Sequence, residues 1–139
     1  MARGFRTGLA LPLFAATGQC RPQADSDSQV LGAIEKSLAN GSGVLLQNMD
    51  SSKLGWRALS EQCLDEIRRC GSDRVQVVVD ACQMRLGRPR LRKYLDRGCM
   101  VIVTGSKFFT GPPFSVALLV PAGFAGALGA VSRTAQGLR

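Results

Sequence analysis

The chain has 139 residues, 45% of them hydrophobic and 20% charged, which is enough for one modest domain with a packed core and excludes a wholly disordered chain. It contains no histidine, the commonest metal ligand and general base, and none of its five cysteines forms a CxxC pair, so we expect no zinc site. The net charge of +8 would suit nucleic acid, but the basic segment 85–97 lacks the repeated aromatic residues of single-strand binders, and we expect no nucleic-acid partner.

The first half of the chain predicts two strands and one helix. The apolar run Leu9–Ala15 predicts a strand that leads into a glycine turn. A polar, turn-like segment follows, in which Asp25 or Ser26 could cap the next helix. Apolar residues at helical spacing predict that helix over Val30–Ala39, and Val44–Gln47 predicts a short strand after it.

The second half alternates helical and strand-like segments. Ser60–Cys70 predicts a helix with Ser60 as its N-cap. The β-branched run Val75–Val79 is typical of a central parallel strand buried on both faces. A short helix at Arg90–Arg97 and strands at Cys99–Val103 and Ser115–Val120 complete the pattern. We therefore predict a single α/β domain over residues 1–139, with a mostly parallel sheet and helices on both faces.

Two segments imitate export or membrane signals. Residues 1–20 place arginines before an apolar stretch, but Pro12 interrupts that stretch and no clean cleavage site follows. Residues 108–132 carry no charge, yet three prolines would repeatedly break a spanning helix, so we predict a turn, a buried strand and a flexible tail there. We expect a cytoplasmic protein with reduced thiols and no membrane partner.

Polar residues gather where three predicted strands end. They are the segments Asn48–Lys53, Asp80–Gln83 and Thr104–Lys107. Ligands of parallel α/β sheets bind just beyond the carboxyl ends of the strands. This edge is therefore the predicted binding site.

Within it, Asp80 and Lys107 suggest a specific chemistry. We expect Lys107, after an apolar strand, to be partly enclosed, and partial enclosure of a lysine amine favours its attack on an aldehyde. Asp80 ends a buried strand, where a carboxylate must be paired, capped or functional. Taken singly, Lys107 could be an exposed loop lysine and Asp80 a structural cap or hydrogen-bond acceptor.

Taken together, these residues match a family pattern. The stretch VVVDACQ, a short helix, and then MVIVTGSKFFTGPP resembles the fold type I pyridoxal-phosphate enzymes, and most nearly the class V aminotransferase and cysteine desulfurase group. Members of that group carry Asp-Ala-x-Gln, a Ser-x-His-Lys-type segment, Gly-Pro and a final strand, in that order. The resemblance covers roughly residues 44–121, part of the large domain of such an enzyme.

The resemblance implies roles for three residues. Lys107 would form the aldimine with pyridoxal 5'-phosphate and carry the proton at the substrate α-carbon. Asp80 would pair with the pyridinium nitrogen, and Gln83 would hydrogen-bond the phenolic oxygen of the cofactor. The implied reaction is that of an aminotransferase-like transferase acting on an amino acid, in an enzyme that is usually a homodimer.

Three further residues complete the implied site, and some expected parts are missing. Thr104 occupies the position of a phosphate-binding serine, Ser106 that of the histidine before the lysine, and Asn48 loosely matches an asparagine near the phenolic oxygen. The sequence shows no glycine-rich phosphate turn, no clearly reactive cysteine and no small C-terminal domain with a carboxylate-binding arginine. The chain is thus expected to be an incomplete, truncated or inactive form. The alternatives are a non-catalytic α/β binding or scaffold domain and, from charge alone, a nucleic-acid-associated protein.

Overall fold

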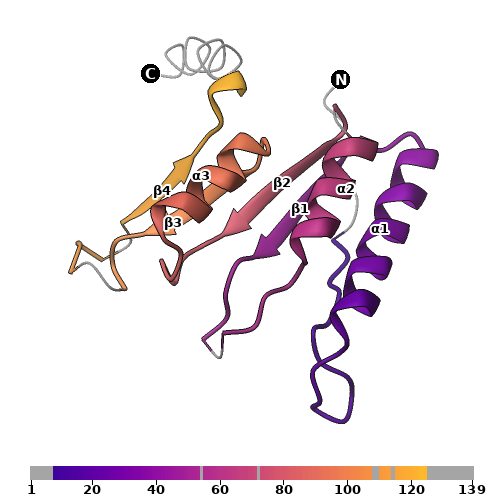
Figure 1. The fold of residues 1–139 in the computed structure, drawn as a ribbon, viewed down its shortest axis with the longest axis horizontal. Coiled ribbons are helices and arrows are strands. Elements are labelled where there is room, and N and C mark those ends of the chain that lie inside the picture. Colours follow the sequence, from indigo (N-terminus) through magenta and orange to yellow (C-terminus); the bar gives the residue numbers. More distant parts are fainter. Residues whose placement is uncertain (1–7, 54, 72, 108–109, 114, 125–139) are drawn as a thin grey trace, which may run out of the picture.

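The computed structural model describes residues 8–53, 55–71, 73–107, 110–113 and 115–124. Within them lies an α/β fold in which three helices accompany a four-stranded open sheet (Figure 1). In chain order the elements are α1 (Gln23–Ala39), β1 (Val44–Met49), α2 (Glu61–Gly71), β2 (Val75–Asp80), α3 (Arg88–Asp96), β3 (Met100–Thr104), β4 (Val116–Leu119) and a 3-10 turn, η1 (Ala122–Phe124). The predicted α/β class is confirmed.

The sheet has the strand order β1-β2-β3-β4. The first three strands are parallel, as the alternation of strands and helices predicts, and β4 pairs antiparallel with β3. Val79 lies opposite Asn48 on one side and opposite Val101 on the other. The carboxyl ends of β1, β2 and β3 therefore meet at one edge, as predicted.

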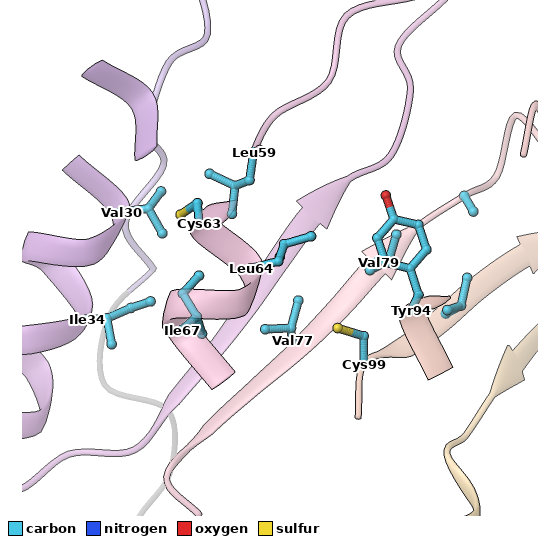
Figure 2. Packing of buried hydrophobic residues seen from close by; sticks show 12 residues of the cluster. Val30, Ile34, Leu59, Cys63, Leu64, Ile67, Val77, Val79, Tyr94 and Cys99 are labelled. Atoms are coloured by element: carbon cyan, nitrogen blue, oxygen red, sulfur yellow. The ribbon is translucent and has the colours of Figure 1, made fainter. Parts of the chain in front are cut away.

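The helices of the described residues cover one face of the sheet, whereas we predicted helices on both. Each strand pairs with its successor, and right-handed crossovers between successive parallel strands leave α2 and α3 on the same side (Figure 1). One core cluster joins the helices to alternate strand residues such as Val77 and Val79 (Figure 2). Val101 of β3 belongs to the same cluster. Val79 and Val101 are completely buried.

The opposite face of the sheet is open. Leu45, Val116 and Leu118 are each at least half exposed there. Asp80 belongs to this face, because strand residues alternate between faces and its neighbour Val79 points into the core. Any group that reaches Asp80 on this face approaches from the side away from the helices.

Local sequence explains how the helices begin. Ser60 caps α2 as predicted, since its hydroxyl accepts the backbone N–H of Cys63 at 3.0 Å. α1 begins earlier than predicted, at Gln23, and includes both Asp25 and Ser26 in its first turns. Its N-cap residue is Pro22, which provides no side-chain hydrogen bond.

The predicted strand Leu9–Ala15 is not formed. The segment makes only a single antiparallel bridge, between Phe14 and Cys20, around a turn closed by Gly18. Pro12 has no N–H to donate to a neighbouring strand, and Leu9 is 71% exposed. The chain therefore enters α1 from a short loop.

None of the helices in the described residues is both long and apolar enough to cross a bilayer. Residues 1–7 of the export-like segment and residues 125–132 of the uncharged segment lie outside the part of the chain that the structure describes. The predicted last strand is confirmed as β4, although most of it is exposed.

Candidate functional site

Three loops meet beyond the carboxyl ends of β1, β2 and β3 (Figure 1). Main-chain hydrogen bonds connect them: the N–H of Asp50 donates to the carbonyl of Asp80 at 3.0 Å, and the N–H of Ala81 donates to the carbonyl of Ile102 at 2.9 Å. Arg85 also donates a side-chain N–H to the carbonyl of Lys53 at 3.0 Å. The three polar segments picked out in the sequence thus share one edge.

Asp80 is the acidic centre of this edge. Its Oδ1 accepts the backbone N–H of Cys82 at 3.0 Å, which starts the turn after β2. Burial alone would raise the pKa of Asp80, but hydrogen bonds from Cys82, the charge of Lys107 and a hydrogen bond from Gln47 together lower it. Asp80 is therefore held as a carboxylate.

Lys107 lies in the turn that follows β3 and is exposed. We expected it to be partly enclosed, but the turn carries it past the end of the strand and away from the packed core. Its charge nevertheless acts on Asp80 and, in the same direction, on the half-buried thiol of Cys82. Burial and the neighbouring Asp80 raise the pKa of Cys82 in spite of Lys107, so this thiol stays protonated and packs as predicted.

Two hydroxyls stand at the end of β3 with different surroundings. Thr104 is buried, and its hydroxyl donates to the carbonyl of Ser115 at 2.9 Å. A threonine hydroxyl has one proton, so in the 2.9 Å contact between Thr104 and Ser106 the donor is Ser106. Ser106 is exposed, and it is the hydroxyl of the pair that a ligand can reach.

The loops around these residues are tightly folded. The N–H of Gly111 donates to the carbonyl of Gly105 at 3.1 Å, and a Cβ on Gly111 would lie only 3.0 Å from that oxygen. Met84 and Thr110, in the loops after β2 and β3, have φ of 45° and 47°, in the left-handed region that favours glycine. Backbone strain of this kind concentrates at ligand and catalytic sites.

The structure does not bring every predicted site residue together. Asn48 pairs with Val79 and is 2% exposed beneath the helices, on the face opposite to Asp80. Gln83 is half-buried in the loop after β2, and its side chain has no hydrogen bond within the described residues. The charge of Lys107 acts on Asp80, and Ser106 precedes Lys107 in the same turn; we call these three residues the Asp80–Lys107 cluster.

Sequence reasoning missed a buried polar cluster on the helix-covered face, formed by Asp50, Arg90 and Tyr94. Arg90 Nη2 lies 2.7 Å from Asp50 Oδ1, and the Tyr94 hydroxyl donates to that same oxygen at 2.7 Å. The hydroxyl projects from the core cluster in Figure 2. No sequence signal paired these residues, because Asp50 is 44 positions from Tyr94.

Gln47 was also missed, although it is the amide that hydrogen-bonds Asp80. Its position in β1, opposite Val78, places it on the same face as Asp80. Only the register between β1 and β2 reveals this.

No three His, Cys, Asp or Glu side chains of the described ranges gather in a way that could hold a metal ion. Compared with known proteins, the chain matches no family model, no curated protein and no solved structure. What this site does must therefore be argued from its own residues.

Proposed function

We propose that this chain holds pyridoxal 5'-phosphate and belongs to an aminotransferase-like transferase that acts on an amino acid. The observation that carries the proposal lies at the sheet edge: Asp80, at the end of β2, is held as a carboxylate in part by the charge of the exposed Lys107 after β3. When bound, the cofactor supplies an aldehyde that condenses with an amine and a protonated pyridine ring that takes up electron density.

The residues fit this group chemically. A protonated ring nitrogen needs an ionised acceptor, and the lowered pKa of Asp80 provides one. An aldehyde needs a reachable primary amine, and Lys107 is exposed. A phosphate oxygen needs donors, and the exposed Ser106 hydroxyl would become one by turning its proton from Thr104 to the phosphate.

Each residue would then have a defined task. Asp80 would hold the proton on the ring nitrogen, and Gln47 would keep the carboxylate of Asp80 oriented. Lys107 Nζ would accept the proton from the α-carbon of the amino acid and return it. The hydrogen bond between Gly111 and Gly105 would fix the backbone position of Lys107.

The proposal is tested by titrating the purified chain with pyridoxal phosphate. We expect an absorbance band at about 410–430 nm, and reduction with borohydride should leave a modified peptide that contains Lys107. Lys107→Ala should abolish the band. Lys53→Ala is the matched control, because Lys53 is an exposed lysine in a loop of the same edge, and it should keep the band.

Two results would contradict the proposal. One is a band of equal strength in Lys107→Ala, with modification spread over the other lysines. The other is the absence of any band in the wild-type chain, which would favour the alternative of a non-catalytic binding or scaffold domain.

A further inference from the structure

We propose that a cavity at the N-terminal end of α1 binds a small organic anion that combines a carboxylate or phosphate with an apolar body. We call it the α1 cavity. Its volume is about 270 Å³, and its lining residues are Leu13, Cys20, Arg21, Gln23, Ser26, Gly55, Trp56 and Arg57. None of them belongs to the Asp80–Lys107 cluster, so this inference goes beyond the proposed cofactor site.

The cavity is positively charged. Arg21 and Arg57 line it, and none of its lining residues in the described part of the chain carries a carboxylate. Arg21 is held in place because its Nη1 donates to the carbonyl of Pro12 at 3.3 Å and to Oε1 of Gln29 at 2.7 Å. Arg57 is exposed and makes no side-chain hydrogen bond or ion pair within the described residues, so its guanidinium is available to a ligand.

A hydroxyl lines the same cavity. Ser26 is 8% exposed as a residue, and its hydroxyl makes no hydrogen bond to any described part of the chain. The hydroxyl oxygen is still reached by solvent, since the buried side-chain atoms without a partner in the described residues belong to Asn48, Arg90 and Ser115. The hydroxyl can therefore donate to an anion that enters the cavity.

The start of α1 adds donors to the same place. The N-cap residue Pro22 has no side-chain hydrogen bond to the helix. The first N–H groups of an α-helix lack intrahelical partners and favour an anion. Here the N–H groups of Asp25 and Ser26 already donate to the carbonyl of Pro22 at 3.1 and 3.3 Å, which leaves those of Gln23 and Ala24, and Asp25 adds a carboxylate to the same turn. The nearby carboxylate of Asp27 is already engaged, because its Oδ1 accepts Gln23 Nε2 at 3.2 Å and the N–H of Ser60 at 3.1 Å.

The apolar part of the ligand follows from the aromatic and aliphatic lining of the cavity. Trp56 is 44% exposed, and Phe14 packs against it edge to face, with ring centroids 6.4 Å apart and an interplanar angle of 84°. Leu13 lines the same cavity. A ring that lies against Trp56 would bury apolar surface while its anionic group reaches Arg57 and Ser26.

Trp56 is the only tryptophan of the chain, so its fluorescence reports this cavity directly. We would titrate the purified chain with phenyl phosphate and with benzoate, which separates the phosphate from the carboxylate, and with benzyl alcohol as the uncharged probe. We expect a saturable change in fluorescence with at least one anion and none with benzyl alcohol at the same concentrations.

Substitutions test which side chains contribute to anion binding. Arg57→Gln should weaken binding about tenfold or more, and Ser26→Ala several-fold, because each removes a donor to the anion. Arg92→Gln is the matched control, an exposed arginine on α3 that should leave binding unchanged. Circular dichroism and thermal unfolding of each variant show that the fold is intact. Lys107→Ala should also bind normally, so failure here and failure of the cofactor proposal are distinguishable.

The inference is overturned if neither anion changes the fluorescence up to millimolar concentrations. It is equally overturned if benzyl alcohol binds as tightly as benzoate, or if folded Arg57→Gln and Ser26→Ala bind as the wild type does. Saturable binding of both anions, weakened by both variants, supports a general anion site, whereas binding of one alone identifies the ligand's charged group.

Discussion

Arg90 of α3 and Asp50, the residue after β1, form an ion pair that is largely removed from water. Their closest atoms are 2.7 Å apart, and their side chains are 23% and 2% exposed. The Tyr94 hydroxyl donates to the same carboxylate oxygen at 2.7 Å and accepts an Arg90 N–H at 3.1 Å. Arg90→Met would leave the Asp50 carboxylate buried beneath α3 with Tyr94 as its remaining side-chain donor.

The loss of stability expected for Arg90→Met follows from the burial of the ion pair. Removing one member of a buried pair costs about 3–5 kcal/mol, because an uncompensated charge stays in the interior. Arg90 keeps roughly a quarter of its surface in water, so we expect the lower end, about 3 kcal/mol. The reference is Arg92 on the same helix, whose pair with Asp96 spans 3.8 Å with side chains 84% and 70% exposed. Arg92→Met should cost about 0–1 kcal/mol.

Urea denaturation followed by circular dichroism measures both variants. With a slope of about 1–3 kcal/mol per molar urea, Arg90→Met should lower the midpoint by about 1–3 M, whereas Arg92→Met should move it by at most about 0.3–1 M for the same slopes. Adding Asp50→Asn to Arg90→Met should recover part of the loss, because the unpaired charge is gone. Equal midpoints for Arg90→Met and Arg92→Met would refute the reasoning.

Three other predictions concern thiols, glycines and acid stability. Burial, and to a lesser extent the nearby Asp27 carboxylate, raises the pKa of Cys63 to about 12. Iodoacetamide should therefore label the exposed Cys70 and spare Cys63 in the native protein. Equal labelling of the two thiols, measured by peptide mass spectrometry, would contradict this. Gly71→Ala would place a Cβ 2.5 Å from Cγ2 of Val75, the first residue of β2. This substitution should lower the free energy of unfolding by about 1–3 kcal/mol, and with it Tm. Gly32→Ala, in open space within α1, should instead stabilise by about 0.5–1 kcal/mol, and a fall in its Tm would count against the comparison. The folded-state pKa of Asp80 is lowered from 3.8, so its contribution to stability is present above that pH and is lost as the pH falls below it; Asp80→Asn should show a shallower decline in an acid titration of stability, and an unchanged decline would contradict the assignment.

Most strands could be predicted because their own residues favour strand over helix. The run at Val75–Val79 is β-branched, buried and bounded by turn residues, and it forms β2 with one residue added. Leu9–Ala15 has a similar apolar content but contains Pro12 and forms no paired strand, because a strand needs a partner as well as a suitable sequence. Composition alone does not supply that partner.

The start of α1 was not predicted, for a different reason. Residues 23–29 are mostly polar and show no apolar stripe, so they resemble a turn. In the fold they extend a helix whose burial begins with Ser26, a residue that hydrophobic patterning does not count. The α1 cavity could not be predicted for a related reason. Its lining joins residues from the loop before α1, the first turns of α1 and the loop after β1.

The face on which each strand residue lies was the decisive unknown for the site. Asn48 and Asp80 both lie near the carboxyl ends of neighbouring strands, and the family resemblance implied that they share one site. The register pairs Asn48 with Val79, so the pleat turns Asn48 toward the helices and Asp80 away from them. Gln47, opposite Val78, shares the face of Asp80 and hydrogen-bonds it. A ring held by Asp80 would therefore meet the amide of Gln47, and the Asp50–Arg90–Tyr94 cluster on the other face would hold α3 in place behind it.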